Sequence, residues 1–160
     1  MGNTDSVQSI ILALGWLGIF APVALGGIGS IIGCTKAGQA AIGALLDVES
    51  GYGKYIGISV MPSTMIIFGV VVTMMMLRYV KEGTIETQHA AGLFGIGVLA
   101  GVALMLCGIN QGRACASCIQ TSKSKPEIFG ISITPAGVIE GFAIFVLVFA
   151  LIAVGTMPIK

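Results

Sequence analysis

Residues 128–157 read IFGISITPAGVIEGFAIFVLVFALIAVGTM and contain one charged residue, Glu140. A helix needs about 20 apolar residues to cross a hydrocarbon core about 30 Å thick. Backbone groups in lipid must find their hydrogen-bond partners within the segment itself. The stretch therefore predicts a membrane-spanning helix with a carboxyl group inside it.

Charged residues divide the rest of the chain into segments of the same kind. Asp, Glu, Lys and Arg are absent between Asp5 and Lys36, between Lys54 and Arg78, and between His89 and Arg113. We expect four membrane-spanning helices, at about 8–33, 56–79, 90–112 and 128–157. Polar connections are expected at 34–55, 80–89 and 113–127.

The composition makes lipid the expected solvent of this chain. Of its 160 residues, 56% are hydrophobic and 9% are charged, and the mean hydropathy is +1.01. A soluble domain has about 25% charged residues, which cover its surface. The net charge of +1 gives no indication of a nucleic-acid partner. We therefore expect a multi-pass membrane protein in contact with lipid.

The two halves of the chain resemble each other. The segment GISVMP at 57–62 is similar to GISITP at 130–135, and KAGQA at 36–40 is similar to NQGRA at 110–114. The repeated unit therefore contains two helices and the connection between them.

The predicted fold is an all-α membrane protein of four transmembrane helices, built as two fused, duplicated helical hairpins. We expect the first hairpin within residues 1–80 and the second within 90–160. A unit with two spans returns the chain to its starting side, so the pseudo-symmetry axis of the two copies must lie along the membrane normal. Such units can build a ring.

Small residues recur every four positions in the first and third predicted helices, whereas the second and fourth are bulkier. Stripes of this kind let two helix backbones approach closely. Ordinary membrane packing would account for them; a sharper interpretation places the first and third helices in a tight inner ring. The stripes consist of Gly18, Pro22, Gly26 and Ser30, and of Gly97, Gly101, Gly108 and Gly112.

Glu140 lies about 18 Å along the last predicted helix, at about 1.5 Å per residue. An ionised carboxylate at that depth costs at least about 2.5 kcal/mol. No Lys, Arg or His lies at a comparable depth in any predicted span. The carboxyl group must therefore hold a proton or bind a cation, as ion transport requires, unless it is a neutral group that only packs against a neighbouring helix.

Two prolines mark the same place in each hairpin. Pro62 and Pro135 lie five residues before Ile67 and Glu140 respectively, so Ile67 occupies the carboxylate position of the first hairpin. Each proline removes one backbone N–H and frees the carbonyl four residues earlier. We expect those carbonyls, at Ile58 and Ile131, to lie near the carboxyl group.

Three segments resemble a known family. GGIGS at 26–30, GINQGRA at 108–114 and VIEGF at 138–142 are similar to the first-helix glycine run, the third-helix end and the ion-carrying stretch of the 16-kDa proteolipid of V-type and A-type rotary ATPases. This proteolipid, designated c or K, builds the rotor ring of those complexes. The likeness covers nearly the whole chain and includes the single carboxylate of the fourth helix.

The resemblance implies an ion-translocating rotor subunit, in which Glu140 loads and releases one ion. Identical copies would form a homo-oligomeric ring that turns against a stator membrane subunit with an essential arginine, and central-stalk subunits would bind on the loop side. The ring would couple ion transport to ATP synthesis or hydrolysis. The protein would be no enzyme and would need no cofactor, because the ATP chemistry lies in other subunits.

The resemblance also implies an ion site. In sodium-using members, a glutamate, a threonine, two glutamines and a backbone carbonyl hold the ion. The matching positions of this chain are Glu140, Thr64, Gln111 and the carbonyl of Met61, with Met65 in place of the second glutamine.

Two departures from that site bear on the ion. Met65 offers a thioether, a poor ligand for a hard cation, and Phe68 replaces a tyrosine that would cap the glutamate. Pro62 and Pro135 support the site from the backbone. We therefore expect H⁺ as the translocated ion, with Na⁺ as the alternative and no other metal.

The distribution of Lys and Arg predicts the orientation. The first and third connections hold five of them and the opposite side holds three. This imbalance favours both long connections in the cytoplasm and both termini outside. We expect a prokaryotic plasma membrane, with a eukaryotic endomembrane as the alternative.

Two other functions remain open. Cys115 and Cys118 form a CxxC motif, which could serve a four-helix membrane thiol–disulfide oxidoreductase. A small cation channel could use Glu140 for selectivity. His89, at a predicted helix boundary, is expected to be a solvated interfacial residue.

Overall fold

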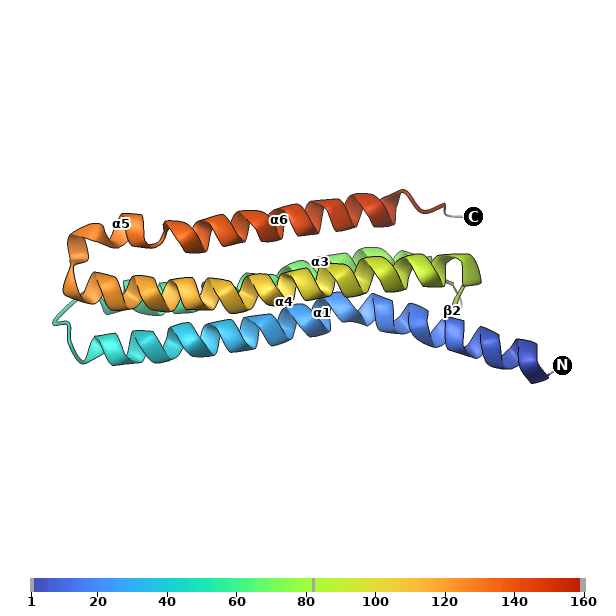
Figure 1. The fold of residues 1–160 in the computed structure, drawn as a ribbon, viewed down its shortest axis with the longest axis horizontal. Coiled ribbons are helices and arrows are strands. Elements are labelled where there is room, and N and C mark those ends of the chain that lie inside the picture. The colour runs from blue at the N-terminus through green and yellow to red at the C-terminus, as the bar shows by residue number, and fades with distance from the viewer. Residues whose placement is uncertain (1, 82, 159–160) are drawn as a thin grey trace.

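The computed structural model describes residues 2–81 and 83–158, which are largely helical and run along one long axis (Figure 1). The α-helices are α1 (Gly2–Leu45), α2 (Tyr52–Ser59), α3 (Thr64–Met76), α4 (Thr87–Ser124), α5 (Phe129–Ser132) and α6 (Thr134–Gly155). The 3-10 turns are η1 (Met61–Ser63), η2 (Leu77–Tyr79) and η3 (Pro126–Ile128). Strands β1 (Val80–Lys81) and β2 (Thr84–Ile85) pair antiparallel.

Four segments are long and apolar enough to cross a membrane. Each contains about 28 residues or more, above the roughly 20 that a bilayer requires. The prediction of an all-α membrane protein with four spans is confirmed. The segments are Ser6–Leu45, Tyr52–Tyr79, Thr87–Ser124 and Pro126–Gly155.

The predicted ends of two helices were wrong. Helix α1 continues past residue 33 to Leu45, and α4 continues past residue 112 to Ser124, so the connections expected at 34–55 and 113–127 are mostly helical. A charge marks where an apolar span ends but does not stop a helix. The extensions are held by packing, because Ala37 and Ala41 of α1 are buried in one cluster with Cys115 of α4.

Helices α1 and α4 lie side by side and contact each other through glycine (Figure 1). A Cβ on Gly97 would lie 1.9 Å from the Gly18 carbonyl oxygen, and one on Gly112 would lie 2.3 Å from the Gly33 Cα. In both pairs the glycines are 79 positions apart. The two helices are therefore parallel and in step. Their common seam is formed on α4 by Gly97, Gly101, Gly108 and Gly112 and on α1 by Gly18, Ala21, Gly29 and Gly33, whereas Gly26 of the predicted α1 stripe faces Met65 of α3.

Helices α3 and α6 pack against this pair. Gly69 of α3 approaches α1 so closely that a Cβ there would lie 2.3 Å from the Pro22 carbonyl oxygen. Ala143 of α6 is buried against Leu104 of α4. Many large apolar side chains face outward, among them Phe145, at 61% exposure. An apolar surface of this extent fits lipid or further protein rather than water.

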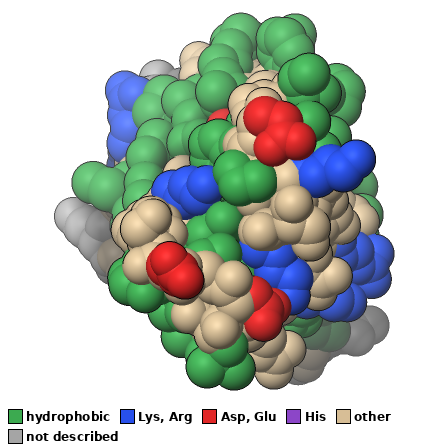
Figure 2. Space-filling model, turned by 90° about the vertical axis from the view of Figure 1, so that its left-hand side faces the viewer, with side chains coloured by type: hydrophobic (Ala, Val, Ile, Leu, Met, Phe, Trp, Pro, Cys, Tyr) green, Lys and Arg blue, Asp and Glu red, His purple; other side chains and the backbone are tan. Residues whose placement is uncertain are grey.

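The two ends of the bundle differ. The connections between α1 and α2 and between α4 and α5 lie at one end, and both chain ends lie at the other (Figure 1). Figure 2 views the connection end, where Lys, Arg, Asp and Glu side chains gather. The Lys123 Nζ lies 2.5 Å from Asp47 Oδ2, which joins the last turn of α4 to the first connection.

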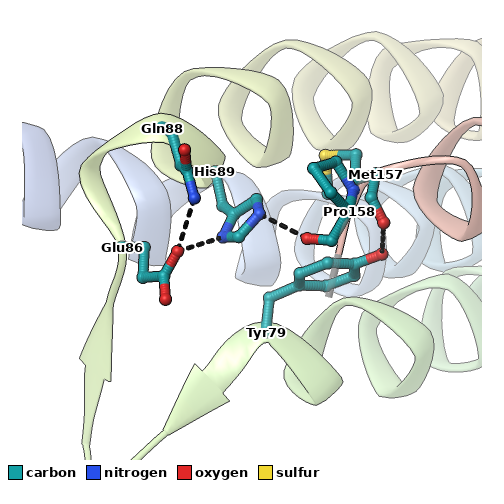
Figure 3. Close-up of polar contacts among 6 residues, drawn as sticks. All are labelled: Tyr79, Glu86, Gln88, His89, Met157 and Pro158. Carbon is teal, nitrogen blue, oxygen red and sulfur yellow. Dashed lines mark hydrogen bonds and ion pairs between the residues drawn. The ribbon is translucent and has the colours of Figure 1, made fainter. Parts of the chain in front are cut away.

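A buried polar cluster holds the end of α6 at the opposite end of the bundle (Figure 3). The His89 Nε2 lies 2.7 Å from the Pro158 carbonyl oxygen, and His89 Nδ1 lies 3.5 Å from Glu86 Oε2. The Tyr79 hydroxyl donates to the carbonyls of Val154 (2.6 Å) and Met157 (3.0 Å). His89 is 5% exposed, so the expectation of a solvated histidine was wrong.

Candidate functional site

The second span is broken at the level of Pro62. Helix α2 ends at Ser59, and α3 begins at Thr64 after the turn η1. Proline has no backbone N–H to donate, so the helix cannot continue its hydrogen bonds through this position. Side chains bond the carbonyls opened by the break: Thr64 Oγ1 donates to Met61 (3.1 Å) and Ser30 Oγ to Pro62 (2.8 Å).

The fourth span is broken at the matching place, as expected for a duplicated hairpin. Helix α5 ends at Ser132 and α6 begins at Thr134, with Pro135 in its first turn. The carbonyls predicted to be free, Ile58 and Ile131, each accept a bond from the N–H two residues further on. The carbonyls of Met61 and Ala136 lie nearer the site instead, bonded to Thr64 and Gln111.

Three predicted site residues meet at one carboxylate oxygen. Glu140 Oε2 of α6 accepts a hydrogen bond from Thr64 Oγ1 of α3 (3.0 Å) and another from Gln111 Nε2 of α4 (2.5 Å). Gln111 is fully buried, whereas Thr64 and Glu140 are half-buried. Within residues 2–81 and 83–158, no ion pair involves Glu140. The two breaks thus set a carboxyl group and two hydrogen-bond donors together without a basic partner.

The amide of Gln111 leaves an acceptor unused. Its Nε2 donates to the Ala136 carbonyl (3.3 Å) and to Glu140 Oε2, both of which are acceptors, and this fixes the orientation of the amide. Its Oε1 is buried and has no hydrogen-bond partner among the residues that the structure describes. A buried polar atom without a partner is uncommon. This atom marks a place next to the carboxyl group where a donor or a cation would be bound.

The other predicted site residues have distinct positions. Met65 is fully buried against Leu104 and Ala143, and Phe68 packs on the same cluster. Neither side chain adds a polar atom to this apolar cluster other than the thioether sulfur of Met65. Met61 reaches the site through its carbonyl, which bonds to the Thr64 hydroxyl. Ile67, at the carboxylate position of the first hairpin, is 56% exposed on the outer surface.

The cysteines of the CxxC motif are enclosed. Cys115 is 0% and Cys118 is 1% exposed, and both thiols are free. Cys118 Sγ lies 3.2 Å from Ser132 Oγ. Thiol–disulfide exchange requires an accessible thiolate, so this geometry disfavours an oxidoreductase.

Sequence reasoning missed the role of Ser30 at this site. Its hydroxyl contacts the break in the second span, although the sequence indicated only a small residue within a stripe. The available signal was a hydroxyl among glycines, since packing alone would be served equally well by glycine.

Comparison with known proteins gives two findings. The family model for the C subunit of ATP synthase matches twice, at residues 17–76 and 94–153. The repeated match corresponds to the two duplicated hairpins. A-type ATP synthase subunit K of Methanocaldococcus jannaschii is 34% identical over 138 residues, which is 86% of this chain and 62% of that protein. This chain therefore spans less than two thirds of the relative's length.

Proposed function

Because the chain belongs to the family of ATP synthase C subunits, we propose that it is the ion-translocating rotor subunit of a V/A-type rotary ATPase. Glu140 carries one ion per protomer. The observation that carries this proposal is the position of Glu140, between donors from two other helices and without a basic partner. Such a carboxyl group can hold an ion within the membrane and release it where a positive charge stabilises the ionised form. The protein contributes no ATP chemistry, which lies elsewhere in the complex.

The apolar surface and the family support the following proposed assembly. Identical copies form a ring, with the glycine seam of α1 and α4 toward the axis and α3 and α6 toward lipid. Glu140 then lies on the outer helix of each copy. A stator membrane subunit with an arginine could approach it there and stabilise the ionised carboxylate during exchange. The apolar outward side chains support this arrangement.

The connection end is proposed to face the cytoplasm and the central stalk. Five Lys and Arg residues belong to the first and third predicted connections, and charged side chains gather at this end (Figure 2). Basic residues are retained on the cytoplasmic side of membrane proteins. We propose that the membrane is a prokaryotic plasma membrane, with a eukaryotic endomembrane as the alternative.

The translocated ion is proposed to be H⁺. Both side-chain contacts of Glu140 Oε2 are donors, and Met65 and Phe68, the two departures from the sodium-binding pattern, offer no oxygen. Sodium ions prefer several oxygen ligands. One observation favours Na⁺ as the second candidate: the unpaired Oε1 of Gln111 could serve as such a ligand.

Labelling with dicyclohexylcarbodiimide tests site and ion together. This apolar reagent partitions into lipid and reacts with the acid form of a carboxyl group. In the purified complex it should modify Glu140 and stop ATP-driven transport, whereas the exposed carboxylates Asp47, Glu49 and Glu127 should remain unmodified. If Na⁺ protected Glu140 from labelling at constant pH, the translocated ion would be Na⁺ and not H⁺. Inhibition without modification of Glu140 would refute the assignment of the site.

A further inference from the structure

The hydroxyl of Ser30 is inserted into the break of the second span. In an uninterrupted helix the Ile66 N–H would donate to the Pro62 carbonyl. Here Ser30 Oγ stands between them, because it accepts from the Ile66 N–H (3.0 Å) and donates to the Pro62 carbonyl (2.8 Å). Ser30 is 6% exposed, so water does not compete freely for these bonds. One residue of α1 thus completes the backbone hydrogen bonding of another helix.

Two glycines bring α1 close enough for this contact. A Cβ on Gly26 would lie 2.7 Å from the Met65 carbonyl oxygen, and one on Gly33 would lie 2.7 Å from the Pro62 Cβ. Gly26 and Gly33 lie on either side of Ser30, about one helical turn away. A larger residue at either position would separate α1 from the broken turn. The three residues therefore form one docking strip for residues 62–66.

The turn that Ser30 spans carries Thr64. Thr64 Oγ1 donates both to the Met61 carbonyl (3.1 Å) and to Glu140 Oε2 (3.0 Å). If the turn closed into a regular helix, or opened further, Thr64 would move relative to α6. The bond between Thr64 and Glu140 thus depends on the separation of the Pro62 carbonyl and the Ile66 N–H, which Ser30 bridges.

We propose that Ser30 is a positioning residue of the ion site, whose hydroxyl holds the turn at 62–66 so that Thr64 reaches Glu140. This inference rests on the proposed function of Glu140. In the second hairpin, Gln111 has a comparable place, since it contacts both the Ala136 carbonyl after the break and Glu140 itself. In each hairpin, a polar side chain from the preceding long helix therefore bonds to the backbone at the break. Gln111 contacts Glu140 directly, whereas Ser30 acts on Glu140 through Thr64.

The test compares pH profiles of carbodiimide labelling at Glu140 in the assembled complex. Variants are Ser30→Ala, Thr64→Ala and the double variant. A hydroxyl that donates to a carboxylate favours its ionised form, so its loss should extend labelling to higher pH. Thr64→Ala should shift the profile by about one to two pH units, the size expected for one hydrogen bond to a charged group. Ser30→Ala should shift it in the same direction.

The double variant tests whether Ser30 acts through Thr64. Its profile should match that of Thr64→Ala alone, because residues that act in series are not additive. Thr73→Val is the matched control: Thr73 Oγ1 donates to the Ile19 carbonyl (2.9 Å), a bond between the same two helices away from the carboxyl group. This variant should leave the profile unchanged.

Three results would overturn the inference. The first is a labelling profile of Ser30→Ala that matches the wild type. The second is a double variant whose shift equals the sum of the two single shifts. The third is a shift in Thr73→Val as large as that in Ser30→Ala. Each would leave the proposed function standing if Glu140→Gln still abolished transport. Conversely, full transport in Glu140→Gln would remove the proposed function whatever Ser30 does, so the two failures can be told apart.

Discussion

The backbones of Gly18 and Gly97 touch across the seam between α1 and α4. A Cβ on Gly97 would lie 1.9 Å from the carbonyl oxygen of Gly18, a separation that no side chain tolerates. The seam joins the first hairpin to the second, so it holds the two duplicated units together.

Gly97→Val should therefore disrupt the fold of the protein. Overpacking usually costs about 1–3 kcal/mol, and here the obstacle is backbone that cannot rotate aside. We expect loss of the assembled complex on a native gel. Gly95→Val on the same helix is the control, since a Cβ there meets nothing within 4 Å. If both variants assembled equally well, α1 and α4 would not pack closely at Gly97 as described.

Met65→Gln should increase the affinity of the site for Na⁺. The substitution places an amide oxygen at the buried position after Thr64, where the resemblance implies the second glutamine, and hard cations prefer oxygen to sulfur. Na⁺ should then protect Glu140 from carbodiimide at constant pH. Met76→Gln, equally buried on α3 but in another cluster, should give no protection. Strong protection already in the unaltered protein would show that Na⁺ is its natural ion.

Tyr79→Phe should loosen the end of α6. It removes the hydroxyl that donates to the Val154 and Met157 carbonyls, and one such bond contributes about 1 kcal/mol. Amide hydrogen exchange at residues 152–157 should become faster, while exchange around Glu140 should stay the same. Tyr52→Phe, which removes an exposed hydroxyl bond to the Glu49 carbonyl, is the control. If exchange at these residues were the same in both variants, the Tyr79 hydroxyl would not stabilise the end of α6.

Replacing both cysteines of the CxxC motif should preserve transport. Cys115 and Cys118 are enclosed between α4 and its neighbours, where their thiols fill space. The double variant Cys115→Ala and Cys118→Ala should lower thermal stability modestly because small cavities remain. Its ATP-driven ion uptake per assembled complex should equal that of the unaltered protein. A selective loss of uptake would revive a redox role.

The sequence predicted the four spans, and it named residues that the structure brings together, for identifiable reasons. The position of charges gave four spans, and the repeated Gly-Ile-Ser motif before Pro62 and Pro135 gave the duplication. Resemblance to the rotor proteolipid brought forward Thr64 and Gln111, and both contact Glu140. These features depend on hydropathy and on side-chain chemistry at fixed positions, which a single sequence contains.

Other features depend on contacts between distant parts of the chain. The extensions of α1 and α4 beyond their first charges are stabilised by packing between helices, which hydropathy does not report. Burial of His89 requires the residues that follow α6 to pack against it, through its contact with the Pro158 carbonyl. The role of Ser30 requires knowing which face of α1 meets the break at Pro62. No local pattern contains that information.

The central claim is that Glu140 carries the ion, and Glu140→Gln tests it most directly. The amide keeps the size of the side chain and can still accept from Thr64, but it cannot take up and release a proton. Glu127→Gln removes an exposed carboxylate from the same hairpin and serves as the control. The measurement is ATP-driven ion uptake into vesicles that contain the complete complex, per assembled ring. We expect no uptake in Glu140→Gln, with assembly intact and normal uptake in Glu127→Gln. Full uptake in Glu140→Gln would contradict it.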